Sequence, residues 1–312
     1  MKIHSLTINE KSYPEYWIFA YNRQLEFLER GKSQDSILNK YKFTNCYRFT
    51  DRVSQHLIKN IINREGLSPQ DTFVQVILFK IFNKIETWES ICCEFGNTNF
   101  EKLDLSRLQL FLDNLKQNNK IYSAAYIMPS GLKEFGSRVK HHNNLAMIKL
   151  MITKELHKKV WEKQNLREIY ELFLSIPSIG KFLAYQYSID IAYSKYSPAE
   201  EHQYVIAGPG AERGIKKCFM DTGKYNLQDV IKIMRDHQHD EFSRLGLDFT
   251  FLGGRELQLI DCQNIFCEVD KYLRVKIPEL NKRNTKIKQI YKPNNLKINY
   301  EAPQKWNLNF LV

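Results

Sequence analysis

Apolar residues recur at intervals of three and four along most of the chain, which is the period of an amphipathic α-helix. This pattern predicts helices over residues 13–30, 53–63, 69–88, 101–117, 143–159, 166–174, 181–193, 227–237 and 255–274. Beyond a short extended start, no stretch alternates clearly between apolar and polar residues, as a half-buried strand would. We therefore predict an all-α fold.

The segment between two of these helices has a distinctive composition. Residues 175–184 read Ser-Ile-Pro-Ser-Ile-Gly-Lys-Phe-Leu-Ala, a tight turn that opens the helix at Lys181. The first N–H groups of a helix lack intrahelical partners, and with the helix dipole they suit a phosphate. The pattern is typical of a helix-hairpin-helix clamp that holds the DNA backbone through Ser178, Ile179, Gly180 and Lys181. A plain Pro-Ser turn between two core helices is the alternative.

Two stripes of polar residues run along helices that are otherwise apolar. The first comprises Lys80, Asn83, Lys84 and Thr87, and the second Gln258, Asp261, Asn264 and Glu268. Polar groups on a buried helix must find partners or face a cavity. The first stripe therefore predicts either a pocket lining or a structural network. The second stripe predicts a functional site in partly buried surroundings, and a solvated helix face is the alternative.

Composition points to a nucleic acid as partner. The 312 residues carry a net charge of +11, and 43% of them are hydrophobic, so the chain is globular and strongly basic. Such a surface favours a polyanion, although a merely soluble basic protein would look the same. Arg48 and Arg52 lie among aromatic residues, which suits base stacking and phosphate contact. They suit an ordinary amphipathic helix equally well.

Several classes of site and location are not expected. No stretch resembles a signal peptide or a membrane span, so a cytoplasmic protein is expected. The six cysteines lack zinc or iron–sulfur spacing. The neighbouring residues His141 and His142 do not share a helix face, so we expect no metal site there. We also expect no bound cofactor.

The glycines near residue 210 fit neither common nucleotide-binding loop. Gly208 and Gly210 would let a ligand approach the backbone closely. However, Gly210 and Gly214 are separated by three residues, and Ile215 stands where a Walker A loop requires lysine. A Rossmann fold is not indicated either, because no βαβ unit surrounds these glycines.

Blocks of sequence in a fixed order resemble a known family. They are Tyr41-Lys-Phe-Thr-Asn45, Asp51-Arg-Val-Ser-Gln55, Phe82-Asn-Lys-Ile-Glu-Thr-Trp88, Tyr122-Ser-Ala-Ala-Tyr-Ile-Met-Pro-Ser130, Gly208-Pro-Gly-Ala211 and Gln258-Leu-Ile-Asp-Cys-Gln-Asn264. Together they resemble the helical domain of the 5-hydroxymethyl-deoxyuridine DNA kinases. That family is related to the alpha-glutamyl/putrescinyl thymine pyrophosphorylases, and both resemble helix-hairpin-helix DNA glycosylases.

This resemblance implies a two-lobed helix-hairpin-helix glycosylase-like fold. It would form one helical domain over residues 1–312. The composition of the tail over 282–312, which is basic and rich in Asn and Pro, predicts a C-terminal wrap that packs through Trp306 and Phe310. The implied partner is DNA with hypermodified pyrimidines, such as that of phages. Because the chain has no phosphate loop, it corresponds to a base-handling domain alone. We therefore predict a DNA glycosylase that excises a modified pyrimidine in defence against phages.

The glycosylase resemblance also suggests roles for individual residues. Bifunctional members have a lysine where this chain has Phe182, so the resemblance implies a monofunctional hydrolase that flips the base out of the duplex. A carboxylate would stabilise the sugar cation and activate water. The candidates are Asp261, then Glu201, which has the family's spacing from the hairpin, then Asp190.

Other residues would bind the flipped base, namely Gln258, Asn264, Glu268, Lys80, Asn83, Lys84, Gly208 and Gly210. Two rival hypotheses remain open. One is an enzyme that remodels the base substituent without cutting the glycosidic bond. The other is a non-catalytic module that binds modified DNA.

Overall fold

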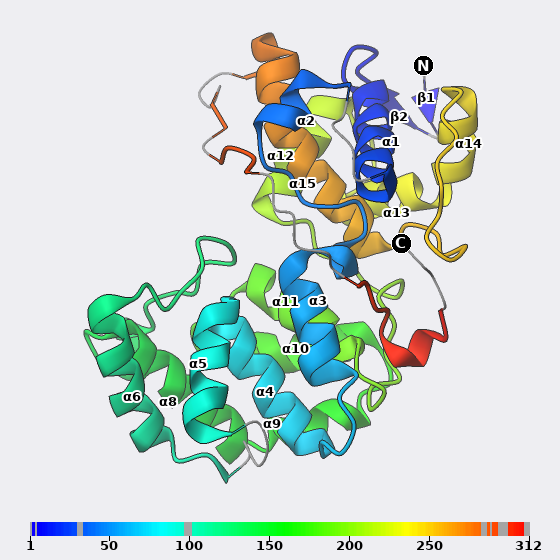
Figure 1. Ribbon diagram of the computed structural model, residues 1–312. Helices are drawn as coiled ribbons and strands as arrows, with labels where there is room; N and C mark the ends of the chain where they lie inside the picture. Colours follow the sequence, from blue (N-terminus) through cyan, green and yellow to red (C-terminus); the bar gives the residue numbers. More distant parts are fainter. Residues whose placement is uncertain are drawn as a thin grey trace. The chain divides into compact units, whose positions relative to one another are not determined.

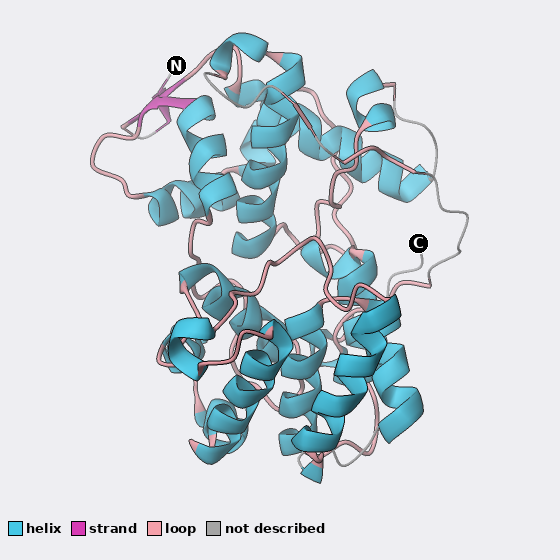
Figure 2. Ribbon diagram, turned by 90° about the vertical axis from the view of Figure 1, so that its left-hand side faces the viewer, coloured by secondary structure: helices cyan, strands magenta, loops and turns pink. Residues whose placement is uncertain are grey.

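The computed structural model describes residues 2–3, 5–29, 34–96, 102–281, 286–287, 289–292 and 299–308. The chain divides into two compact units. Unit 1 comprises Met1–Asp51, Tyr204–Tyr300 and Asn309–Val312, and unit 2 comprises Arg52–Gln203 and Glu301–Leu308. Most of the described chain is helical (Figures 1 and 2), as the sequence pattern predicted.

Unit 1 packs its helices around α15. Its helices are α1 (Tyr13–Glu29), α2 (Ser36–Lys40), α12 (Pro209–Cys218), α13 (Leu227–Asp236), α14 (Gln238–Arg244) and α15 (Leu259–Lys276), with 3₁₀ turns at Arg48–Thr50 and Pro278–Leu280. Aromatic residues of α1 bury themselves against α15, with the Tyr16 and Phe266 rings 4.5 Å apart. The N-terminal and C-terminal parts of the chain thus share one core.

A small sheet in unit 1 was not predicted. Three antiparallel strands lie in the order β1 (Lys2–Ile3), β2 (Leu6–Ile8) and β3 (Phe219–Asp221). Each strand has only two or three residues. A stretch this short cannot establish a period of two, so alternation could not reveal it.

Unit 2 is a bundle of shorter helices. They are α3 (Arg52–Leu57), which continues in a π-helical turn (Ile58–Ile62), α4 (Pro69–Phe82), α5 (Ile85–Phe95), α6 (Leu105–Asn118), α7 (Leu132–Phe135), α8 (Lys140–Thr153), α9 (Leu156–Lys159), α10 (Leu166–Leu174) and α11 (Lys181–Ala192), with 3₁₀ turns at Val160–Glu162 and Gln304–Trp306. Both α4 and α11 are buried along nearly their whole length.

The predicted limits of several helices agree with the structure, whereas two of the predicted helices are interrupted. Ser68 caps α4 by accepting a hydrogen bond from the backbone N–H of Asp71, as predicted. The helix predicted to run from residue 69 to 88 is interrupted, because Asn83 adopts a left-handed conformation with φ of 48°. A second interruption occurs at Glu155, with φ of 58°, where the predicted 143–159 helix divides into α8 and α9.

The proposed C-terminal wrap is described only in part. The Trp306 ring packs edge-on against Tyr193, with 5.3 Å between the ring centroids. Phe310, the other predicted anchor, lies outside the described residues. Within the described parts of the chain, no helix is both long enough and apolar enough to cross a membrane.

Candidate functional site

The predicted hairpin joins α10 to α11 in unit 2. Ser178 has a φ of 70°, a left-handed conformation that favours glycine, and its hydroxyl donates to a carboxylate oxygen of Glu134 at 2.8 Å. Gly180 is the residue that precedes α11, and no side chain caps this helix start. Lys181 follows and is exposed. The hairpin therefore presents an uncapped helix start together with a cation, which suits an anionic ligand.

Two residues predicted separately from sequence meet in the interior of unit 2. Lys80 on α4 and Asp190 on α11 form an ion pair, with 3.4 Å between Nζ and Oδ2. Both side chains are at most 2% exposed. Removing two charges from water is costly, so a buried pair is weak support for a stabilising role. Such a pair is compatible with a functional role, and its Asp190 lies on α11, the helix that follows the hairpin.

An aromatic pair lies beside this ion pair. The Lys80 Nζ is 4.6 Å from the centroid of the Tyr126 ring, and Tyr126 stacks on Phe182 with an interplanar angle of 13°. Both rings are partly exposed. Tyr126 has a φ of 51°, an uncommon conformation for a residue with a bulky side chain. Unit 2 therefore combines a buried charge pair with partly exposed aromatic surface beside the hairpin.

Sequence reasoning did not assign Tyr126 or Phe182 to the site. Tyr126 belongs to one of the blocks that carried the family resemblance, which was the available signal. Next to it, Ile127 is 77% exposed, which is unusual for a large apolar residue. An exposed apolar side chain beside stacked rings is a surface on which a nucleic-acid base can pack.

The rest of the first polar stripe is used internally. The Asn83 side chain donates to the hydroxyl of Ser123 at 3.3 Å. The Lys84 ammonium donates to the backbone carbonyl of Lys120. Because the helix ends at Phe82, these residues do not continue the line of Lys80 as a single helix would have placed them.

Asp261 performs a structural task at the start of α15. One of its oxygens accepts the Arg48 backbone N–H at 2.7 Å, and the other accepts the Gln258 backbone N–H at 2.9 Å. The Gln258 side chain in turn accepts a hydrogen bond from the Asp261 backbone N–H, which completes a capping box. These contacts explain why a carboxylate can be buried at this point.

The remaining residues of the second stripe differ in environment. Glu268 accepts the Thr44 backbone N–H at 3.1 Å and pairs with Lys271 at 2.6 Å. Asn264 is partly exposed. Glu201 and Asp190 are both buried, but they lie in unit 2, whereas Asp261 lies in unit 1.

The predicted glycine and arginine residues occupy distinct positions. Gly208 precedes α12, while Gly210 faces Cys267 so closely that an added Cβ would lie 3.0 Å from its sulfur. Gly210 therefore serves helix packing in this structure. Arg48 is 1% exposed, so its guanidinium lies in the interior of unit 1. Arg52 is exposed at the start of α3.

Comparison with known proteins places the chain in the class of DNA-kinase helical domains. The chain belongs to the family described as 5-hmdU DNA kinase, helical domain, whose model matches residues 10–282. It is 26% identical over 310 residues to a Bacillus phage SP10 protein named 5-hmdU DNA kinase. This match covers 92% of the chain but 48% of that protein, so the chain spans about half the relative's length. No solved structure matches significantly.

These findings correct the glycosylase prediction. The relative carries the name of a kinase, which transfers a phosphate and does not hydrolyse an N-glycosidic bond. The predictions of a monofunctional DNA glycosylase, a hydrolase, and base excision were therefore wrong. The prediction failed because a hairpin motif indicates at most a mode of binding and does not specify the reaction. The kinase-family resemblance is confirmed, whereas none of the comparisons shows the helix-hairpin-helix glycosylase superfamily or its two-lobed fold.

Proposed function

We propose that this chain recognises a 5-hydroxymethylpyrimidine in DNA and presents it for phosphorylation of its hydroxymethyl group. The observation that carries the proposal is the match to the 5-hmdU DNA kinase over 92% of the chain. The net charge of +11 supports a DNA partner. The sequence has no Walker A loop, so the proposal assigns recognition of the base, and not ATP binding, to these residues.

The surface proposed for this recognition lies in unit 2. In the proposal, the hairpin at Ser178–Lys181 holds the DNA backbone through backbone N–H groups and the Lys181 ammonium. Tyr126 and Phe182 offer rings for stacking against an unpaired base. The buried Lys80–Asp190 pair holds the neighbouring ring in position through the contact between Lys80 and Tyr126.

The decisive experiment compares the affinity of the chain for matched oligonucleotides. One carries a single 5-hydroxymethyl-deoxyuridine, and its control carries thymidine, which lacks only the hydroxyl. We expect about fivefold to 150-fold tighter binding to the hydroxymethyl base, because an unpaired polar group costs about 1–3 kcal/mol. Equal affinity for the two would overturn the proposal.

A second measurement tests the class of reaction. After incubation with ATP and Mg²⁺, the DNA is digested to nucleosides and analysed by mass spectrometry. A phosphorylated hydroxymethyl nucleoside would extend the role of this chain from recognition to catalysis. Intact nucleosides together with preferential binding are the result expected for the chain alone. Because stacking does not distinguish the two bases, Tyr126→Ala should weaken the binding of both oligonucleotides. Tyr225→Ala on unit 1 serves as a matched control and should leave both affinities unchanged.

A further inference from the structure

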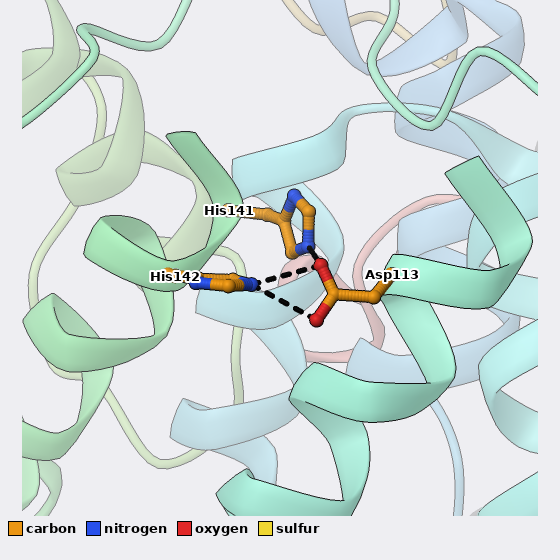
Figure 3. Close-up of side chains that lie close together, drawn as sticks. All are labelled: Asp113, His141 and His142. Carbon is orange, nitrogen blue, oxygen red and sulfur yellow. Dashed lines mark hydrogen bonds and ion pairs between the residues drawn. The ribbon is translucent and has the colours of Figure 1, made fainter. Parts of the chain in front are cut away.

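Three side chains in unit 2 converge at a place that the proposed function does not use. Asp113 on α6 faces His141 and His142 in the first turn of α8 (Figure 3). The Nε2 atoms of both histidines lie 2.8 Å from the same carboxylate oxygen of Asp113. The Nε2 of His142 is also 3.0 Å from the other oxygen.

The sequence alone led us to expect no metal here, because neighbouring histidines do not share a helix face. Their side chains do leave the helix in different directions, and their ring planes are 88° apart. The carboxylate of Asp113 nevertheless lies where both rings reach it, because α6 packs against α8. Asp113, which brings the two histidines together, is on another helix and lies 28 residues from His141 in sequence. The spacing of residues within one helix could therefore not reveal this cluster.

The three donors form a recognisable ligand set. Two imidazole nitrogens and one carboxylate bind zinc in hydrolases and iron(II) in oxygenases, with further coordination positions left open. Bonds of about 2.0–2.1 Å in a tetrahedral arrangement place ligand atoms about 3.3 Å apart. All three ligand atoms here lie within 4.8 Å of one another. Small side-chain rotations would therefore bring them to coordinating positions.

The cluster is closed on one side and open on the other. His141 is 1% exposed, whereas the side chains of His142 and Asp113 are 23% and 38% exposed. The Nδ1 of His141 is buried with no partner among the described residues, so its ring makes its polar contact at Asp113. An ion bound here would have protein ligands on the inner side and solvent or a ligand on the outer side.

We propose that Asp113, His141 and His142 form a binding site for one divalent transition-metal ion, with zinc as the representative ion. In the metal-free protein, each imidazole can donate an Nε2 proton to the carboxylate. Binding requires the Nε2 lone pairs, so each ring's proton moves to Nδ1, which is buried in His141. Lys116 adds positive charge near His141. Both effects predict moderate affinity.

The test uses the untagged, full-length chain after treatment with a chelator. Cys93 is exposed and could itself bind zinc, so all proteins carry Cys93→Ser. Isothermal titration with zinc(II) should show one site, and cobalt(II) should give the visible absorption bands of a nitrogen- and oxygen-ligated ion. Asp113→Asn and His142→Gln should each weaken zinc binding by more than about tenfold.

The matched control removes a histidine from a simpler contact. His239 pairs with one carboxylate, Glu256, at 2.8 Å and has no second histidine in that contact. His239→Gln should leave zinc binding unchanged. If Asp113→Asn does not fold, the partly exposed His142→Gln decides the question. Absence of one-to-one binding, or unchanged binding in His142→Gln, would overturn the proposal.

Discussion

At the scale of single residues, the buried Lys80–Asp190 pair is sensitive to the loss of either partner. Lys80→Met would leave the Asp190 carboxylate in the interior without its lysine partner. We expect the free energy of unfolding to fall by about 3–5 kcal/mol, because an uncompensated buried charge is costly. Urea denaturation measures this change.

A double variant separates the charge effect from a packing effect. Lys80→Met/Asp190→Leu removes both charges, so it should recover most of the lost stability. If the double variant were as unstable as Lys80→Met alone, the unpaired charge would not be the cause of the lost stability.

Asp51 gives unit 1 a pH dependence. Burial raises the pKa of Asp51 to about 6, although a hydrogen bond from the Asn45 backbone N–H acts in the opposite direction. The folded protein therefore holds the proton more tightly than the unfolded chain, whose aspartate pKa is about 3.9. The stabilising contribution is complete below pH about 4 and is lost as the pH rises through about 6.

Asp51→Asn removes this titration while keeping an oxygen for the Asn45 N–H. At pH 7 the variant should be more stable than the parent by about 3 kcal/mol, and the difference should shrink toward pH 4. Thermal unfolding across that pH range measures it. The exposed residue Asp248 provides the control, since Asp248→Asn should shift stability little at either pH. A constant effect of Asp51→Asn across the range would contradict the prediction.

At the scale of elements, the contact between α12 and α15 depends on a glycine. A Cβ at position 214 would lie 2.1 Å from the carbonyl oxygen of Phe266, which is backbone and cannot rotate away. Gly214→Ala would push the helices apart, so we expect a loss of about 3 kcal/mol in urea denaturation.

Gly180→Ala is the matched comparison for Gly214→Ala. Gly180 has a φ of −86°, and an added Cβ there would meet nothing within 4 Å. The free energy of unfolding of the Gly180→Ala variant should stay within about 0.5 kcal/mol of that of the parent. Equal losses in the two variants would refute the packing argument.

Local chemistry could be predicted from sequence, whereas contacts between elements could not. The Ser68 cap and the limits of α10 were predicted because they depend on neighbouring residues. The break at Asn83 was missed because its left-handed backbone leaves the apolar period of the surrounding residues intact. Asp261 was recognised as a buried carboxylate, but its contact with Arg48 lies 213 residues away in sequence.

The same limit applied to the candidate sites. Lys80 and Asp190 were each singled out, yet no spacing rule could pair residues on α4 and α11. The reaction class was predicted wrongly for a related reason, since the hairpin describes how DNA could be held and carries no information on the bond that changes.

At the scale of the whole molecule, the net charge of +11 predicts salt-sensitive DNA binding. Lys181→Glu should weaken binding of an oligonucleotide and reduce the slope of log affinity against log salt by about 1 if this lysine contacts a phosphate. Fluorescence anisotropy at several salt concentrations gives the slope. Lys232→Glu on α13 changes the net charge equally, so a similar effect in both variants would argue against a specific role for the hairpin.

The division of the chain into units also has a consequence for biosynthesis. Unit 2 interrupts unit 1, because Arg52–Gln203 separates its first segment from α12 and α15. At about 5–20 residues per second, a ribosome needs roughly 8–30 s to make the intervening stretch. During that time the aromatic side chains of α1, including Tyr16 and Phe19, lack the partners on α15 that bury them in the finished protein. The nascent chain therefore exposes these apolar rings while the intervening stretch is made, and unit 2 can begin to fold before unit 1 is complete.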